Sequence, residues 1–198
     1  MRVKCCREKN LSYIVIDDYF TPDELMEIRQ ELWDIKRLAV PSDLENSAVK
    51  DGKPLRSGTC TFVDNLYRLR KNSFLLTANR KLFSKELVDE LVEFDAAFTL
   101  LRTANSDYTI VNYYHPEEDY LPHTDETRIT AISLFGYGDF EGGGLVFPEQ
   151  NVTVGFCENR TVIFISAVLH GSVPIKGSSD SFRVSAANFV GHIEDINR

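Results

Sequence analysis

The sequence lacks a long apolar run, a paired-cysteine pattern and an excess of positive charge, and each absence excludes a class of protein. No stretch approaches the apolar length that a membrane span needs, and the opening residues lack the apolar core of a secretory signal. Cys5 and Cys6 are adjacent, Cys60 and Cys157 stand alone, and no CxxC pair occurs. We therefore expect reduced thiols in a cytoplasmic protein, with neither a disulfide framework nor a zinc knuckle.

The charge and the length of the chain set further bounds. A formal net charge of −8 disfavours nucleic acid and anionic membranes as partners and favours a neutral or basic substrate. The 198 residues, of which 43% are hydrophobic, fit one domain over residues 1–198. Within it we expect supporting elements in residues 1–106 and a β-rich core in residues 107–191. The sequence gives no indication of the oligomeric state.

Two helices are expected in the first half of the chain. Thr21 supplies an N-cap, Pro22 the first helical position and Glu24 a capping-box acid, which predicts a helix over residues 22–36. Apolar residues in steps of three and four predict a second helix over residues 84–101. Helical spacing of this kind indicates packing against a sheet.

From residue 107 onward the pattern changes to short β-rich runs separated by Gly, Pro and acidic turns. The runs are YTIVNYY, a strand around YLPHTD, ITAISLF, GLVF, VTV, TVIFI, LHGSV and FRVSAANFV. A further strand is expected at residues 13–20. Eight short strands without intervening helices predict a mainly β fold, a double-stranded β-helix or jelly roll, with the N-terminal helices packed on one face.

Two segments carry no clear element. Residues 38–57 are polar with two prolines and a glycine, which predicts a surface loop. Residues 65–85 hold six basic and no acidic side chains, which predicts either contact with an anionic partner or a solvated face. Residues 38–57 and 65–80 are both candidates for a lid over a site.

A possible metal site is indicated by His123, Asp125 and His170. On an extended strand, side chains at i and i+2 project from the same face, so His123 and Asp125 can hold one ion. His170 follows the apolar run TVIFI, and a jelly roll can bring it alongside them. Two imidazoles and a carboxylate form the facial triad of iron(II) oxygenases, although HxD also arises by chance and a zinc hydrolase uses a similar set. We expect His115 and His192 to be structural or surface residues.

A possible anion site lies on two strands near these ligands. Arg183 and Ser185 share one face of the last strand, and a covered arginine needs an anion such as a carboxylate. The alternative is an edge-strand arginine in water. Asn112 and Tyr114 share one face of an earlier strand, where the Tyr114 hydroxyl is placed to donate to a bound carboxylate and Asn112 to contact the other end of the same molecule. Tyr113 faces the opposite side and is expected in the core.

Together these residues resemble the iron(II) and 2-oxoglutarate-dependent oxygenases, and within them the prolyl-4-hydroxylase-like group. The segment NYYHPEEDYLPHTD resembles the group's Tyr, Tyr and His-x-Asp pattern, FEGGGLVF resembles its glycine-rich turn and strand, and IVIDDYFTPDEL resembles its first strand and helix. The resemblance places Tyr114 at the cosubstrate-facing tyrosine and Tyr120 at the aromatic three residues before the first metal ligand, where it is a candidate substrate contact. It places His170 at the distal metal ligand, and Arg183 with Ser185 at the cosubstrate carboxylate.

The resemblance implies a jelly-roll catalytic core that uses Fe(II), 2-oxoglutarate and dioxygen, with ascorbate as a candidate reductant. It implies hydroxylation of a C–H bond with release of succinate and CO2, with a protein or peptide substrate, prolyl among the candidates. Two alternatives stay open: a small-molecule hydroxylase, for example of free amino acids, and a jelly-roll binding module without catalysis.

Some positions depart from particular subgroups. The usual loop glycine is replaced by Glu117 or Glu118, and Leu134 stands where oxygen-sensing prolyl hydroxylases have a second cosubstrate tyrosine. Animal collagen hydroxylases have a lysine at the position of Arg183. Nucleic-acid dealkylases share Asn-x-Tyr and His-x-Asp, but they also carry a second arginine downstream of the anchor, where this chain reads Asn-Phe-Val-Gly at residues 188–191.

Overall fold

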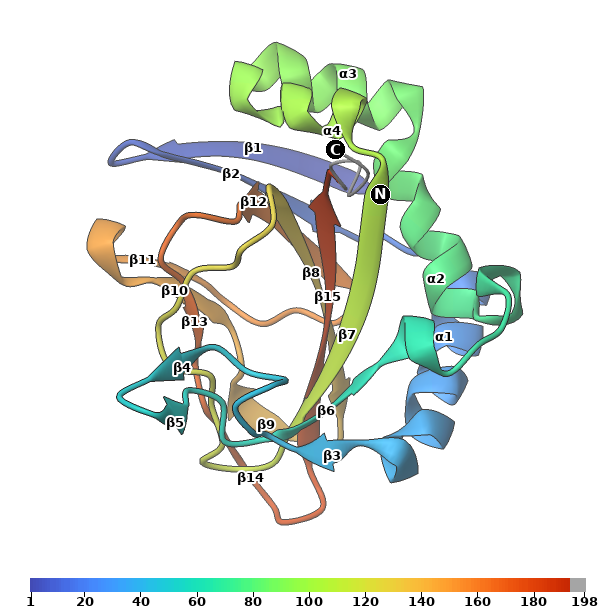
Figure 1. Ribbon diagram of the computed structural model, residues 1–198, viewed down its shortest axis with the longest axis vertical. Coiled ribbons are helices and arrows are strands. Elements are labelled where there is room, and N and C mark those ends of the chain that lie inside the picture. Colours follow the sequence, from blue (N-terminus) through green and yellow to red (C-terminus); the bar gives the residue numbers. More distant parts are fainter. Residues whose placement is uncertain (193–198) are drawn as a thin grey trace, which may run out of the picture.

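An eight-stranded antiparallel sheet dominates the computed structural model, which describes residues 1–192 (Figure 1). In spatial order its strands are β1 (Arg2–Glu8), β2 (Leu11–Asp17), β12 (Arg160–Ile165), β8 (Ile129–Tyr137), β15 (Phe182–Gly191), β7 (Ser106–Tyr114), β6 (Thr59–Phe62) and β3 (Val40–Pro41). The long strand β15 pairs along nearly its whole length with both β7 and β8. These three strands form the buried centre of the sheet, because most of their residues are buried on both faces.

Shorter strands close the second layer of the roll. They are β11 (Val152–Val154), β10 (Leu145–Phe147) and β13 (Gly171–Ser172) in one small sheet, β14 (Ile175–Gly177) with β9 (Phe140–Gly142), and the hairpin β4 (Val49–Lys50) with β5 (Lys53–Pro54). An apolar cluster between β10, β11 and the inner face of the main sheet holds the two layers together. The predicted mainly β jelly roll is confirmed.

Helices cover the outer face of the main sheet, on the side away from β10, β11 and β13 (Figure 1). They are α1 (Pro22–Ile35), α2 (Phe74–Asn79), α3 (Lys85–Phe94) and α4 (Leu100–Thr103), with 3-10 turns η1 (Lys36–Leu38), η2 (Val63–Asn65), η3 (Arg70–Asn72), η4 (Arg80–Phe83) and η5 (Ala96–Thr99). One more 3-10 turn, η6 (Pro148–Gln150), connects β10 to β11 in the other layer. The predicted first helix is confirmed, including its capping box between Thr21 and Glu24. Within residues 1–192, no helix is long and apolar enough to cross a membrane.

The prediction of one helix over residues 84–101 is wrong, because the helix α3 ends before Asp95. Asp95 has an extended backbone, with φ −151° and ψ 125°. Its carboxylate accepts from Ala97 N–H at 2.9 Å and from the Ser12 hydroxyl at 2.6 Å, and it pairs with Arg7 at 3.1 Å. Asp95 therefore caps a new turn and ties it to the strands β1 and β2, and these bonds outweigh continued helical spacing.

The strands also differ from expectation in two ways: some were not predicted, and one predicted strand does not form. The opening residues form β1, paired with β2 from Arg2 to Glu8, and β6, β9 and β14 were likewise not predicted. The segment YLPHTD is not a strand: it has only isolated bridges, Arg56 to Tyr120 and His123 to His170. Pro122 lacks an N–H to pair, which limits the segment to single contacts.

The two unassigned segments have defined structures. Residues 38–57 contain β3, β4 and β5, so this surface loop is partly ordered by pairing. In residues 65–85, four of the six basic side chains pair with carboxylates of the chain: Arg70 with Asp64 and Asp107, Arg80 with Asp107, Lys81 with Glu24, and Lys85 with Asp89. This pairing removes much of the charge that suggested an anionic partner.

Candidate metal and dicarboxylate site

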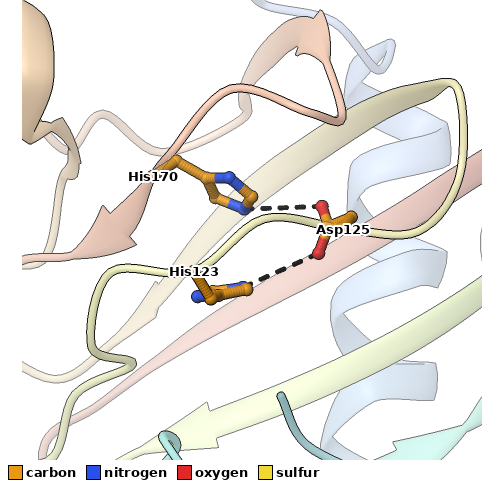
Figure 2. A group of neighbouring side chains, drawn as sticks. All are labelled: His123, Asp125 and His170. Atoms are coloured by element: carbon orange, nitrogen blue, oxygen red, sulfur yellow. Dashed lines mark ion pairs between the residues drawn. The ribbon is translucent and has the colours of Figure 1, made fainter. Parts of the chain in front are cut away.

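The side chains of His123, Asp125 and His170 converge at one point between the two layers (Figure 2). Nε2 of His123 lies 3.6 Å from Oδ1 of Asp125, and Nε2 of His170 lies 3.4 Å from Oδ2. Their ligand atoms all lie within 4.8 Å of one another. A single ion with bonds of about 2.1 Å can contact all three from a central position.

Backbone hydrogen bonds hold the two imidazoles in a ligating orientation. His123 and His170 exchange N–H to carbonyl bonds of 2.8 and 2.9 Å, so one bridge replaces the expected strand. Nδ1 of His123 donates to the Leu121 carbonyl at 2.8 Å, and Nδ1 of His170 donates to the Val168 carbonyl at 2.9 Å. A carbonyl oxygen only accepts, so each Nδ1 carries the proton and each Nε2 presents its lone pair to the metal position.

Asp125 is oriented by hydroxyl groups on neighbouring elements. The Thr130 hydroxyl, at the start of β8, donates to Oδ2 of Asp125 at 2.6 Å. Ser166 supports this contact, because its hydroxyl lies 2.9 Å from that of Thr130 and its carbonyl accepts the Asp125 N–H at 3.0 Å. These contacts fix the carboxylate toward the imidazoles.

The electrostatics of the group also suit a cation. Burial raises the pKa of Asp125 above its usual value, because its charge is removed from water. Burial lowers the pKa of His123 to about 3, with a further contribution from His170. His123 is therefore neutral at physiological pH, which is the form that binds metal.

The three side chains open into a cavity of about 700 Å³, and Arg183 of β15 lines the same cavity. This volume is in the usual range of small-molecule sites. Arg183 is only 1% exposed, its Nη1 donates to the Gly143 carbonyl at 3.0 Å, and its Nε has no partner. Burial lowers its pKa, and among residues 1–192 no carboxylate pairs with it. A buried cation with an unused donor calls for an anionic ligand.

Ser185, Asn112 and Tyr114 face this cavity as expected from strand alternation. The guanidinium carbon of Arg183 lies over the Tyr114 ring, 4.3 Å from the ring centroid. Nδ2 of Asn112 lies 3.4 Å from Oγ of Ser185. Burial raises the pKa of Tyr114 to about 12, so its hydroxyl stays a donor. Tyr113 is in the opposite core, as predicted.

Tyr120 and Arg56 complete the cavity wall on the metal side. The Tyr120 ring stacks on His123, with centroids 3.6 Å apart and planes 19° apart, and its hydroxyl accepts the Ala48 N–H at 2.7 Å. Arg56 is 3% exposed and was not predicted as a site residue. A lone arginine in a polar loop has no spacing that separates it from solvated arginines, so the sequence carried no signal for it.

The structure leaves other candidates outside the cavity. His115 packs against Phe182, with ring centroids 5.7 Å apart, and the exposed His192 lies 3.0 Å from the Thr103 carbonyl through Nδ1. Residues 44–50 line the cavity, but none of residues 65–80 does. The lid expectation for residues 65–80 is therefore wrong.

No protein-family model matches the chain, and no curated protein matches it in sequence. Among solved structures, it is similar to a Trichoplax adhaerens prolyl hydroxylase in complex with a hypoxia-inducible-factor oxygen degradation domain peptide (TM-score 0.61, 15% identity, 90% of this chain and 83% of that chain). It is also similar to a Pseudomonas putida prolyl-4-hydroxylase (TM-score 0.61, 14% identity, 92% and 93%). The chain has the prolyl hydroxylase fold.

The same fold extends to another kind of enzyme. The chain is similar to SnoN, a non-heme α-ketoglutarate-dependent epimerase from nogalamycin biosynthesis (TM-score 0.55, 12% identity, 89% of this chain and 76% of that chain). Coverage near nine-tenths also brings most of residues 38–106, where the sequence offered no motif, into the prolyl hydroxylase fold. At these identities the comparison establishes the arrangement of the chain.

Proposed function

We propose that this protein is an iron(II)- and 2-oxoglutarate-dependent dioxygenase that hydroxylates a C–H bond. The observation that carries the proposal is Arg183, a buried cation without a carboxylate partner in the same cavity as His123, Asp125 and His170. A metal site alone fits several enzymes. A metal site beside an unpaired buried arginine fits a ligand that chelates the metal at one end and carries an anion at the other.

The chain's own residues would bind and orient this cosubstrate. Arg183 and Ser185 would hold the distal carboxylate, Tyr114 would donate its hydroxyl, and Asn112 would contact the same molecule through its amide. Bound iron and 2-oxoglutarate supply the oxidising chemistry, with release of succinate and CO2. The protein contributes a dry cavity and a fixed geometry, as the burial of all four side chains supports.

Iron is favoured over zinc by the same pairing of features. Two histidines and an aspartate would hold iron(II) and leave positions open on it for a keto acid and dioxygen. A zinc hydrolase needs one open position for water and has no use for a buried arginine that binds a dicarboxylate.

A protein or peptide substrate is our leading proposal, with prolyl residues among the candidates. The Trichoplax neighbour was solved with a peptide, and Tyr120 lines the cavity beside the metal position, where a substrate side chain would enter. A small-molecule hydroxylase is the second candidate, since SnoN has the same fold and belongs to nogalamycin biosynthesis. We propose a cytoplasmic protein and ascorbate as the reductant that maintains turnover.

Succinate formation tests the proposal. The iron-loaded protein in air should convert 2-oxoglutarate to succinate even without substrate, and added ascorbate should extend the number of turnovers. His123→Ala should abolish the reaction, whereas His192→Ala, which changes an exposed histidine outside the cavity, should leave it unchanged. Absence of succinate from a protein with bound iron would instead support a binding module without catalysis.

The substrate class needs a separate experiment. The iron-loaded protein is incubated with a library of proline-containing peptides and with free amino acids, and mass spectrometry detects the gain of one oxygen atom. We expect oxygen on peptides. Oxygen found on free amino acids alone would refute the peptide assignment and leave the oxygenase assignment intact.

A further inference from the structure

Arg56 is a second buried arginine beside the metal and dicarboxylate positions, and its environment differs from that of Arg183. Its Nε donates to Oγ of Ser42 at 2.8 Å, and its Nη2 donates to the carbonyl and Oδ1 of Asn46 at 2.5 and 2.7 Å. These three acceptor atoms belong to residues 42–56, which we call the strap. Arg56 therefore holds the strap in a fixed shape from its last residue.

The same guanidinium reaches out of the strap to the sheet. Nη1 of Arg56 donates to Oδ1 of Asn112 on β7 at 2.5 Å. With Oδ1 used in this way, the amide of Asn112 must present Nδ2 on its other side, where it lies 3.4 Å from Oγ of Ser185. Arg56 thus decides which end of Asn112 faces the cavity.

The orientation of Asn112 matters because an amide has a donor end and an acceptor end. A ligand carboxylate beside Ser185 is attracted by the N–H groups of Nδ2 and repelled by Oδ1. If a group that only accepts, such as a carbonyl or carboxylate, stood in place of the Arg56 guanidinium, it would not select the orientation in which Oδ1 of Asn112 faces it. A guanidinium, which only donates, selects it without exception.

The strap also contacts residues 120–123, the segment that ends at the candidate metal ligand His123. Ala48 N–H donates to the hydroxyl of Tyr120, whose ring stacks on His123, and Leu121 N–H donates to the Leu55 carbonyl at 3.0 Å. Arg56 thus connects the strap to Asn112 at the dicarboxylate position, and Tyr120 connects it to His123 at the metal position. The strap forms a wall of the cavity.

We infer that Arg56 is a positioning residue that holds the strap as this wall and turns the donor end of Asn112 toward the dicarboxylate. The role in dicarboxylate binding rests on the proposed function, whereas the tie between the strap and Asn112 does not. In this account Arg56 acts through Asn112, so the two substitutions are expected to have shared effects.

The first test uses the metal-free protein and is independent of the proposed function. Hydrogen exchange by mass spectrometry is measured at residues 42–48 in Arg56→Gln, Asn112→Ala and the double variant. Arg56→Gln should speed exchange by about tenfold or more, and the double variant should exchange no faster than Arg56→Gln. Arg160→Gln is the matched control, because Arg160 pairs with Asp17 and does not line the cavity.

The second test measures 2-oxoglutarate affinity with iron(II) under anaerobic conditions. Arg56→Gln should weaken binding about tenfold, equivalent to about 1.4 kcal/mol, with no further loss in an Asn112→Ala background. Arg56→Lys keeps the positive charge but has a single donor nitrogen in place of the guanidinium's three, so its affinity should fall between those of the wild type and Arg56→Gln. It replaces Arg56→Gln if that variant does not fold. Unchanged exchange at residues 42–48, or equal losses of affinity in both backgrounds, would overturn the inference. If the wild type does not bind 2-oxoglutarate, the proposed function is refuted. The exchange test then still decides whether Arg56 links the strap to Asn112.

Discussion

Arg183 carries a buried positive charge. In the proposed function, the counter-ion of this charge is the cosubstrate. A buried charge without a partner destabilises the free protein, because removal from water is not repaid by an ion pair. The free protein therefore carries a local instability that ligand binding relieves.

This leads to opposite effects of one substitution. Arg183→Met keeps most of the volume and removes the charge, so the melting temperature of the free protein should stay equal or rise. The same variant should bind 2-oxoglutarate at least about a hundredfold more weakly, since hydrogen bonds to charged groups contribute about 1.5–3 kcal/mol each. Thermal unfolding and anaerobic titration measure the two effects. A large loss of stability with unchanged affinity would mean that Arg183 is structural.

Thr130 gives a second prediction for a single residue. Its hydroxyl donates to Asp125, so Thr130→Val should lower iron affinity about tenfold or more, as is usual for groups that orient metal ligands. Thr161→Val is the control, because Thr161 is equally buried and bonds to Ser133 away from the cavity. Equal iron affinities of the two variants would contradict the role given to Thr130.

At the scale of residues, the sequence identified pairs of site residues that stand two positions apart. His123 and Asp125 stand at i and i+2, and Arg183 and Ser185 repeat that spacing on a strand. Thr130 and Arg56 act through contacts that only the folded chain creates. Nothing in their local sequence distinguishes them from other hydroxyl or basic residues.

The strand β7 shows how one element separates stability from binding. Tyr113 lies on the helix side, where its hydroxyl donates to the Leu32 carbonyl of α1 at 2.8 Å, and Tyr114 lies on the cavity side against Arg183. Alternation of side chains along the strand puts two adjacent tyrosines to different uses.

The matched pair Tyr113→Phe and Tyr114→Phe tests this separation. Tyr113→Phe should lower the free energy of unfolding by about 1–3 kcal/mol, because a buried carbonyl loses its donor, with 2-oxoglutarate affinity unchanged. Tyr114→Phe should weaken 2-oxoglutarate binding with little change in stability. Denaturant unfolding and anaerobic titration distinguish them, and the reverse pattern would refute the placement.

Elements were predictable from the sequence where local pattern and tertiary packing agree. The helix α1 has both a capping box and helical spacing, and it formed as expected. The break at Asp95 depends on Ser12 and Arg7, which lie more than eighty residues away. The segment around His123 was expected as a strand because of its composition, yet it finds a partner only at His170.

At the scale of the whole molecule, the net charge does not tell which charged side chains are buried at the cavity. The chain carries a net charge of −8, yet two buried arginines, Arg56 and Arg183, line the cavity together with the acidic residues Asp125 and Glu126. The overall charge disfavours polyanions on the surface, and in the proposed function the buried Arg183 binds a small dianion that enters the cavity. Sequence composition revealed only the first of these properties, because burial of particular side chains depends on the fold.

The sheet as a whole should respond to acid through Asp17. The Arg160 guanidinium holds the pKa of the Asp17 carboxyl below its usual value of 3.8, and the pair links β2 to β12. A lowered folded pKa means that this stabilisation is present above pH 3.8 and is lost as the pH falls below it. Asp17→Asn should therefore reduce stability by about 1 kcal/mol at pH 7, and the difference should vanish in strong acid. Denaturant unfolding between pH 2 and 7 measures it, and a difference independent of pH would contradict the pairing.

The most direct measurement of the proposed function is an anaerobic titration of the protein with iron(II) and 2-oxoglutarate, followed by visible absorbance. The wild type should develop the charge-transfer band of a keto acid bound to iron, at one equivalent each. The band should require far more 2-oxoglutarate in Arg183→Met and should be lost in His123→Ala. Iron binding without this band at any 2-oxoglutarate concentration, or a band with equal affinity in the Arg183 variant, would contradict the proposal.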